Sequence, residues 1–297
     1  MNLQDVLNAS TLGSIYLLFA LGMALVWGTM GILNFAHGSV FMFSAFVGYL
    51  ITSRIPLPLP AVVLIAMVVG AVLTLAIQYF AYQPILKKIK SVNAAELQIV
   101  VAGIGLSVIP IALAEKETLS NNFGFQGSTF QTVVYQFGDL RISNIMIIIL
   151  VLGLGLGFGT AWWIAKSRQG LGLRAVGIDP EVAALMGVDR RKMALATMAF
   201  AGALAGLAGA LLTYYLTALN PHSGEGLILK AFAAIILGGL GSVLGVILGS
   251  FILAFAETAV FAYTSGTWVS AVSFGLILIL LVVRPQGILG KKEVRRT

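Results

Sequence analysis

Long runs without a charged side chain restrict this sequence to few kinds of fold. Asp, Glu, Lys and Arg make up 10% of its 297 residues, whereas a soluble domain carries about 25%. So few charges cannot cover a globule in water, and lipid must therefore be the main solvent of this chain. The uncharged intervals are residues 6–53, 55–86, 97–114, 142–165, 193–224, 231–256 and 258–283.

Each interval can hold at least one helix across a membrane, because about 20 apolar residues span the hydrocarbon layer. The first interval has room for two helices, or for one helix followed by a broken one. None alternates in the manner of an outer-membrane barrel strand. We therefore predict an all-α polytopic membrane protein with about eight to nine transmembrane helices. We expect it to be a single membrane-spanning domain over residues 1–297.

The positions of the basic residues predict which loops face the cytoplasm. Lys and Arg gather in the segments 87–90, 166–192 and 284–296, which are cytoplasmic by the positive-inside rule. The segment 115–142 mixes acidic and basic residues, and we expect it to be a periplasmic loop. The N-terminus then lies outside and the C-terminus in the cytoplasm. This clustering also explains the net charge of +7 without a surface for nucleic acid.

A short sequence echo links the two ends of the chain. Residues 37–40 read His-Gly-Ser-Val and residues 240–243 read Leu-Gly-Ser-Val, each after small or bend-forming residues. Paired interrupted helices are typical of the central pathway of a transporter, so we expect two pseudo-symmetric halves with broken or re-entrant segments. The alternative is that the glycines only allow close helix packing. The candidate translocation-pathway residues are Asn34, Phe35, His37, Gly38, Ser39, Gly238, Gly239, Gly241 and Ser242.

Ionisable side chains in or near the predicted spans are further candidates. His37 can satisfy backbone carbonyls freed by a helix break or contact a passing substrate, and we favour the first role; Asn34 has the same two interpretations. Glu257 is an isolated acid in the last part of the chain, and we expect it to be a solvated capping residue near the outer interface. Lys230 and Glu225 are expected at the outer surface.

The central basic loop contains a short helix with clear boundaries. Asp179 is suited to the N-cap, Pro180 to the first turn and Glu181 to the positive end of the helix dipole, while Gly187 is suited to end it. A helix of roughly two turns is not stable alone in water. It either lies on its own membrane domain as a connector or inserts into a groove of a partner. The residues of this loop helix are Asp179, Pro180, Glu181, Val182, Ala183, Ala184, Leu185, Met186 and Gly187.

Four motifs stand out, at residues 34–38, 174–187, 201–211 and 230–241. They resemble the permease subunits of bacterial ATP-binding cassette (ABC) importers for branched-chain amino acids. They cover most of the chain in the expected order, and Asn-Phe-Ala-His-Gly is similar to the shorter of that system's two permeases. Relatives often carry an acid after His-Gly, where this chain has Ser39. Urea and amide permeases share the architecture, so the resemblance does not determine which substrate is transported.

The resemblance implies a permease that translocates branched-chain or related amino acids across the bacterial inner membrane. The implied partners are a second permease subunit in a heterodimer, two cytoplasmic ABC ATPase subunits and a periplasmic substrate-binding protein, within membrane lipid. The loop helix at 179–187 is then similar to the family's coupling helix, which sits in a groove of the ATPase. ATP and Mg²⁺ are used by the ATPases. This sequence has no phosphate-loop motif, so we expect no enzyme activity and no cofactor or metal in this subunit.

Other classes of protein stay open on the sequence. A urea or amide ABC permease would share the same features. A stand-alone secondary transporter or channel would also use broken helices, but it needs ion-coupling groups, and buried carboxylates are nearly missing from the predicted spans. A membrane scaffold protein fits the interrupted, glycine-rich segments less well. Two histidines and no cysteine are too few for a metal cluster built from these ligands.

Overall fold

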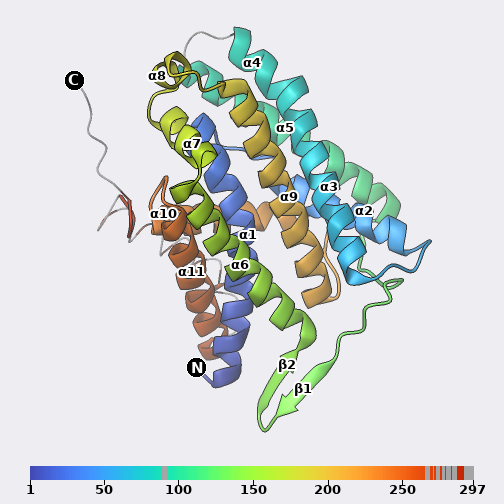
Figure 1. The fold of residues 1–297 in the computed structure, drawn as a ribbon. Coiled ribbons are helices and arrows are strands. Elements are labelled where there is room, and N and C mark those ends of the chain that lie inside the picture. Colours follow the sequence, from blue (N-terminus) through green and yellow to red (C-terminus); the bar gives the residue numbers. More distant parts are fainter. Residues whose placement is uncertain are drawn as a thin grey trace.

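Helices make up nearly all of the regular structure in the computed structural model, which describes residues 1–88, 92–264, 268–269, 271, 275, 278, 282 and 286–290 (Figure 1). The π-helical turn η1 (Gln78–Tyr82) joins α3 to α4. The α-helices are α1 (Leu3–Met30), α2 (His37–Thr52), α3 (Leu59–Ile77), α4 (Gln83–Lys88), α5 (Val92–Thr118), α6 (Asn144–Lys166), α7 (Arg168–Ile178), α8 (Pro180–Leu185), α9 (Arg190–Leu216), α10 (Ser223–Gly238) and α11 (Val243–Tyr263).

Six segments among the described residues are long and apolar enough to cross a membrane. The helical and polytopic class predicted from the charge-free intervals is therefore confirmed. Half of the interval 258–283, which holds the predicted last crossing, lies outside the described residues, so the total of about eight to nine crossings stays a prediction. The six segments are Leu3–Met30, Leu59–Lys88, Ala94–Thr118, Asn144–Lys166, Arg190–Leu216 and Val243–Tyr263.

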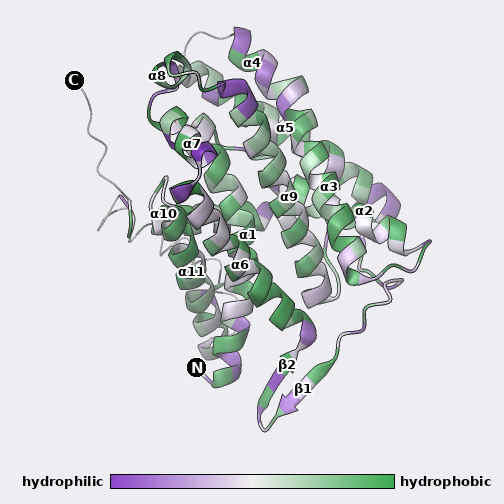
Figure 2. Cartoon of the chain, viewed as in Figure 1, coloured by the Kyte–Doolittle hydropathy of each residue, from purple (hydrophilic) through white to green (hydrophobic). Residues whose placement is uncertain are grey.

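Hydrophilic residues collect at two opposite ends of the helix bundle (Figure 2). One end, which we call the basic end, carries α4, α7 and α8. The other, which we call the hairpin end, carries the start of α1 and the antiparallel strands β1 (Val134–Phe137) and β2 (Leu140–Ser143), paired from Val134 opposite Ser143. The segments predicted to face opposite sides of the membrane thus lie at opposite ends of the molecule. The hairpin itself was not predicted.

Helices α1 and α9 form the centre of the bundle. The most apolar window of α1 is 83% buried, whereas that of α5 is only 28% buried. Small residues let the helices approach closely: a Cβ added at Gly202 or Gly206 of α9 would collide with backbone oxygens of Gly70 or Ala66 in α3. These two glycines therefore serve the close packing of α9 on α3. Such contacts hold helices together where lipid supplies no hydrophobic drive.

Two breaks interrupt the helical path inside the bundle, at the positions expected from the sequence echo. Helix α1 ends at Gly31, whose φ of +67° favours glycine, and α2 begins at His37 beside the middle of α1. Helix α10 ends at Gly238, and α11 restarts at Val243. Both α2 and α10 are 16 residues long, which is short for a crossing of about 20 residues.

A buried ionic cluster joins α1, α10 and α11. Glu257 is 4% exposed, and its Oε2 accepts hydrogen bonds from Tyr16 Oη at 2.7 Å and from Lys230 Nζ at 2.8 Å. Lys230 Nζ also donates to Tyr16 Oη at 2.8 Å and lies 5.0 Å from the centre of its ring. The prediction of a solvated Glu257 was therefore wrong, whereas Lys230 is partly exposed and reaches inward to this carboxylate. Helix α11 continues past Glu257 to Tyr263, and Lys230 supplies the charge that permits the burial.

A second, exposed cluster joins the end of α5 to the start of α10. His222 Nε2 lies 2.9 Å from Glu115 Oε1, and His222 Nδ1 lies 3.3 Å from Glu225 Oε1. The Glu225 side chain is exposed, as predicted. The hydrogen bond to Glu115, followed by that to Glu225, raises the pKa of His222 above its usual 6.5. The protonated imidazole thus bridges two carboxylates from two helices.

We predict that Glu257→Gln lowers the free energy of unfolding by about 3 kcal/mol, because it leaves the Lys230 ammonium without its buried counter-charge. Replacing both partners, as Glu257→Gln with Lys230→Met, should recover much of that loss. Thermal unfolding of the purified chain in detergent measures the difference. Glu225→Gln, which removes an exposed carboxylate from the same part of the fold, is the matched control. Equal stability of the Glu257 and Glu225 variants would contradict a stabilising role for the cluster.

We also predict that His222 titrates above pH 6.5. Because its pKa is raised, the stability from these contacts is full below the unfolded-state pKa and is lost as the pH rises through the folded-state pKa. The chain has two histidines, so NMR of ¹³C-labelled histidine side chains can follow His222. Glu115→Gln should move the midpoint down more than Glu225→Gln does. A midpoint that neither variant moves would show that the carboxylates do not hold the proton.

Candidate functional site

Helix α8 has the boundaries that the sequence predicted. Asp179 caps it, because one carboxylate oxygen accepts the backbone N–H groups of Glu181 and Val182, both at 3.0 Å. The helix runs over Pro180–Leu185, and Gly187 follows with a φ of +84°. That angle lies in the left-handed region where glycine carries no Cβ penalty. The loop helix is therefore a defined element rather than an irregular connector.

Most of the apolar surface of α8 is not covered by the rest of the chain. Leu185 is 86% exposed and Met186 79% exposed, and Val182 is exposed as well, whereas Ala183 is buried. A helix this short is not stable in water without support, and exposed apolar side chains gathered in one place mark an interaction surface. The arrangement can therefore insert Leu185 and Met186 into a concave apolar partner.

The support for α8 comes from α7, which the sequence did not predict. Ser167 Oγ accepts the N–H of Gly170 at 2.9 Å and caps this helix. A Cβ at Gly177 of α7 would collide with the carbonyl oxygen of Gly28, so α7 rests on the end of α1. Its glycines argued against a helix in the sequence. The Ser167 cap was the signal that could have revealed it.

On its other side, α8 leads directly into α9. Asp189 Oδ1 accepts the N–H groups of Arg191 at 2.9 Å and Lys192 at 3.1 Å. The hydrogen bond from the Lys192 N–H is the main cause of the lowered pKa of Asp189, so this cap stays ionised at neutral pH. The two ends of the loop are thus fixed to α1, through α7, and to α9.

The break between α1 and α2 is lined with polar side chains. Asn34 Oδ1 accepts the N–H of Ala36 at 3.1 Å and the hydroxyl of Tyr82 at 2.7 Å. His37 Nε2 lies 3.2 Å from the carbonyl oxygen of Phe19 within α1, rather than from a carbonyl of the break. Among the described residues, Asn34 Nδ2 and His37 Nδ1 are buried without a hydrogen-bond partner. Each can therefore bond a polar group that enters the break.

The first group of pathway candidates meets the start of α10. A Cβ at Gly38 would collide with the backbone of Gly224, so α2 and α10 touch at their first turns. Phe35, Gly38 and Ser39 line a cavity of about 20 Å³, which has room for one water molecule. The other residues that line it are Ser107, Ile111, Pro221, Gly224, Glu225 and Ile228.

The second group of candidates lies at the far end of α10. A Cβ at Gly238 would collide with the backbone of Gly245, and one at Gly239 with Gly290. Ser242 Oγ accepts the N–H of Gly245 at 3.1 Å and caps α11. With Gly241 it borders a cavity of about 60 Å³ beside α7. The 16 residues of α10 separate the two groups by about 24 Å, so the structure does not bring them together.

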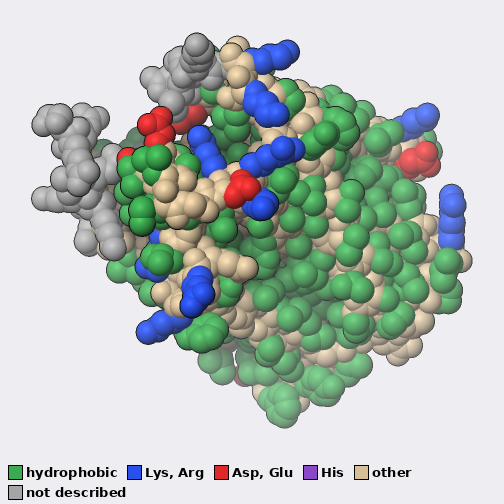
Figure 3. Space-filling model, turned by 45° about the horizontal axis from the view of Figure 1, so that its top comes forward, with side chains coloured by type: hydrophobic (Ala, Val, Ile, Leu, Met, Phe, Trp, Pro, Cys, Tyr) green, Lys and Arg blue, Asp and Glu red, His purple; other side chains and the backbone are tan. Residues whose placement is uncertain are grey.

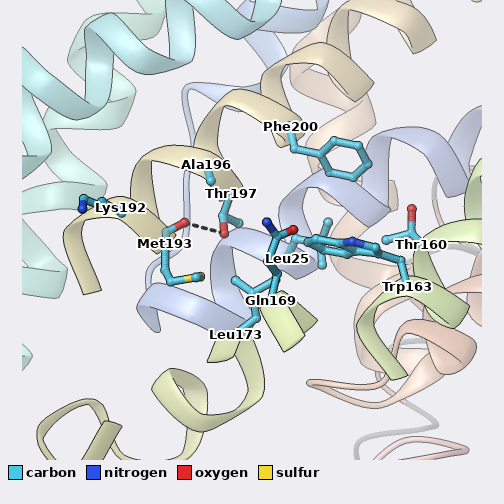
Figure 4. A pocket seen from close by; sticks show the side chains of 10 residues that line it. All are labelled: Leu25, Thr160, Trp163, Gln169, Leu173, Lys192, Met193, Ala196, Thr197 and Phe200. Atoms are coloured by element: carbon cyan, nitrogen blue, oxygen red, sulfur yellow. Dashed lines mark hydrogen bonds between the residues drawn. The ribbon is translucent and has the colours of Figure 1, made fainter. Parts of the chain in front are cut away.

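A larger cavity, of about 570 Å³, lies between α1, α6, α7 and α9 near the basic end (Figure 4). Figure 4 shows the ring of Trp163, the amide of Gln169 and the ring of Phe200 along its wall. Its remaining lining is largely apolar, with Thr160, Thr197 and Lys192 as the polar residues. This cavity was not predicted, because its walls bring α6 and α7 together with α1 and α9, which lie elsewhere along the chain. Gln169 and Leu173 belong to α7, so a movement of α7 changes its shape.

Comparison with known proteins identifies the type of chain. The family described as branched-chain amino acid transport system / permease component matches residues 6–282. The permease LivH of Escherichia coli K12 is 30% identical over 99% of this chain and 97% of its own length. BraD of Pseudomonas aeruginosa is also 30% identical, over the same shares of the two chains. A probable LivH of Methanocaldococcus jannaschii is 29% identical over 93% of this chain and 89% of its own.

More distant permeases match only part of the chain. The ribose import permease RbsC of Haemophilus influenzae is 28% identical over 45% of this chain and 43% of its own length. No solved structure matches the chain. The full-length matches agree with the resemblance carried by the four sequence motifs. This chain therefore belongs to the family of permease components of branched-chain amino acid transport systems.

Proposed function

We propose that this chain moves branched-chain or closely related amino acids across the bacterial inner membrane as the permease of an ATP-driven importer. The observation that carries the proposal is α8, whose apolar side chains are exposed although both of its ends are fixed to long transmembrane helices. Its partners are then two cytoplasmic ABC ATPases, a second permease subunit and a periplasmic substrate-binding protein. The ATPases hold ATP and Mg²⁺, and this subunit carries no catalytic residue, cofactor or metal.

In this proposal, α8 sits in a groove of the ATPase and transmits its closure to the membrane. Movement of α8 reaches α1 through α7, because Gly177 packs on Gly28, and reaches α9 through the cap at Asp189. The two helices pack against each other and between them contact most of the bundle. The breaks after Gly31 and Gly238 are the points at which the helix direction changes, so they are the natural hinges.

The orientation in the membrane follows from the charges. Lys and Arg side chains gather over the end that carries α4, α7 and α8, whereas hydrophobic side chains cover most of the remaining surface in view (Figure 3). The positive-inside rule places this end in the cytoplasm and the hairpin end, with the N-terminus, outside. The binding protein then delivers substrate on the side of the hairpin.

The substrate path in this proposal starts near the touching ends of α2 and α10. Asn34 and His37 carry buried polar atoms without a protein partner, which are suited to a transient hydrogen bond with a moving substrate. Phe35, Gly38 and Ser39 border the narrow cavity beside them. Gly238, Gly239, Gly241 and Ser242 then lie at the cytoplasmic exit. The narrowness of the first cavity fits a path that is closed in the resting state.

A urea or amide permease would use the same architecture, and the nature of the substrate distinguishes it from an amino acid importer. A stand-alone secondary transporter is less well supported. Glu257 is the one buried carboxylate among the described residues, and it is already paired with Lys230. Coupling to an ion gradient requires titratable or ion-binding groups that are not committed in this way.

We predict that Leu185→Ser combined with Glu181→Ala lowers ATP-dependent uptake about tenfold or more, because α8 loses a central apolar contact with the ATPase. The amount of protein in the membrane should not change, because both side chains are exposed. Uptake of radiolabelled leucine in cells that express the whole transporter measures the effect. Co-purification of the ATPase should fall in parallel.

Leu119→Ser is the control for that experiment, because Leu119 is similarly exposed but lies at the other end of α5, away from α8. This variant should transport as well as the wild-type chain. Normal uptake and normal ATPase binding by the Leu185 and Glu181 double variant would refute the assignment of α8.

The proposal also predicts that the chain has no energy source of its own. Purified protein in phosphatidylcholine vesicles should not concentrate leucine, with or without a proton or sodium gradient. Adding the ATPases, the second permease, the binding protein and ATP should produce uphill transport. Accumulation of solute in vesicles without any ATPase would favour the secondary transporter instead.

A further inference from the structure

A pocket that none of the sites above uses lies between the α3–η1–α4 segment and the start of α9. Its volume is about 430 Å³. It combines three basic side chains with two aromatic rings, whereas the 570 Å³ cavity of Figure 4 is mostly apolar. The residues that line it are Tyr79, Phe80, Gln83, Pro84, Lys87, Lys88 and Arg191.

Among the described residues, no acidic side chain lines this pocket. No salt bridge found in that part of the chain involves Lys87, Lys88 or Arg191. Isolated basic side chains on a surface are usually just solvated. Three that converge on one concave site repel each other, and an anion placed among them relieves that repulsion. The charge pattern therefore points to an anionic ligand.

The fold holds these side chains in place by two local devices. The π-helical turn η1 leaves Tyr82 facing inward, where it bonds Asn34, while Tyr79 and Phe80 are exposed with their ring centres 5.1 Å apart. Single π-helical turns often occur at functional sites. On the other wall, the Asp189 cap fixes the first turn of α9, which carries Arg191.

The surface next to the pocket is apolar and faces out of the bundle. Leu64, Val68 and Val72 of α3 are exposed at four-residue spacing, so they form a stripe along one side of that helix. The stripe leads toward the exposed ring of Tyr79. Along this segment an apolar stripe is followed by aromatic rings and then by basic side chains. A phospholipid has a matching arrangement, because its apolar acyl chains are followed by a charged headgroup.

We propose that this pocket binds the phosphate-bearing headgroup of an anionic phospholipid, with its acyl chains along the α3 stripe. The observation that favours a lipid over a soluble anion or a protein is that the exposed apolar stripe and the basic pocket belong to one helical segment, α3–η1–α4, with Tyr79 of the pocket about two turns beyond Val72 of the stripe. A lipid seated there would bridge α4 and the first turn of α9, which directly follows the α8 loop. The proposal concerns lipid binding and does not depend on the transported substrate.

The test is a titration of the purified full-length chain in detergent with dioleoylphosphatidylglycerol or dioleoylphosphatidylcholine, with bound lipid counted by native mass spectrometry. The wild-type chain should retain phosphatidylglycerol in preference to phosphatidylcholine. The triple variant Lys87→Gln, Lys88→Gln, Arg191→Gln should lose at least about tenfold in affinity for phosphatidylglycerol, because each basic residue contributes to attraction of an anionic headgroup. Its binding of phosphatidylcholine should not change.

A second triple variant, Lys166→Gln, Arg168→Gln, Lys192→Gln, is the matched control. It removes the same charge from the same end of the molecule, and none of its residues lines the pocket. It should retain the preference for phosphatidylglycerol. Equal losses in both triple variants would show a diffuse effect of net charge and would overturn the proposal, as would unchanged phosphatidylglycerol binding by the pocket variant.

Two further arms separate the other possible ligands. Inorganic phosphate should not displace phosphatidylglycerol at millimolar concentration, and full displacement would mean a site for free phosphate. If the pocket variant loses co-purification of the ATPase while it keeps lipid binding, the surface is a protein interface. A photoreactive phosphatidylglycerol tests the wild-type chain directly, even where the pocket variant fails to fold. Its crosslinks should fall within residues 79–88, and crosslinks confined to other helices would overturn the assignment.

Discussion

Every backbone N–H and C=O group that leaves a helix within the hydrocarbon layer needs a partner from the protein. This requirement decides where the chain is allowed to break. The break after Gly31 is covered by Asn34, which bonds the N–H of Ala36, and by the packing of α5 and η1 around it. The break after Gly238 is closed by Ser242 and by close glycine contacts. Both breaks therefore have protein partners for the backbone groups that they expose.

The helices form two packed groups that meet along α1 and α9. Helices α2 and α3 pack on α9, whereas α10 and α11 pack on α1, where Tyr16, Lys230 and Glu257 tie them together. Each group contains one of the two interrupted segments, and the groups also touch at Gly38 and Gly224. The loop that carries α8 is attached to both groups, through α7 and through α9. A force on α8 would thus act across the seam between them.

The features predictable from the sequence are those that depend on neighbouring residues. Charge-free runs predicted the long helices, and the Asp179 cap with Gly187 predicted α8, because both signals are local. The burial of Glu257 was not predicted because its partners Tyr16 and Lys230 come from other helices. Pairing between helices produces no regular residue spacing in the sequence. Helix α7 was missed because its glycines lower helix propensity, while its close contact with α1 requires one of them, Gly177. The large cavity was missed for the same reason as Glu257.

If the substrate passes the α1–α2 break, as proposed, the described residues of that break offer it few polar partners, which has a consequence for where selectivity arises. Among the described residues, Asn34 Nδ2 and His37 Nδ1 are the buried polar atoms of the α1–α2 break that lack a partner. A conducting pathway must bind its cargo well enough to admit it and weakly enough to release it. Two such contacts cannot strongly separate one small polar solute from another. In an ATP-driven importer, discrimination can rest on the binding protein that delivers the substrate, so these helices need only open and close a path.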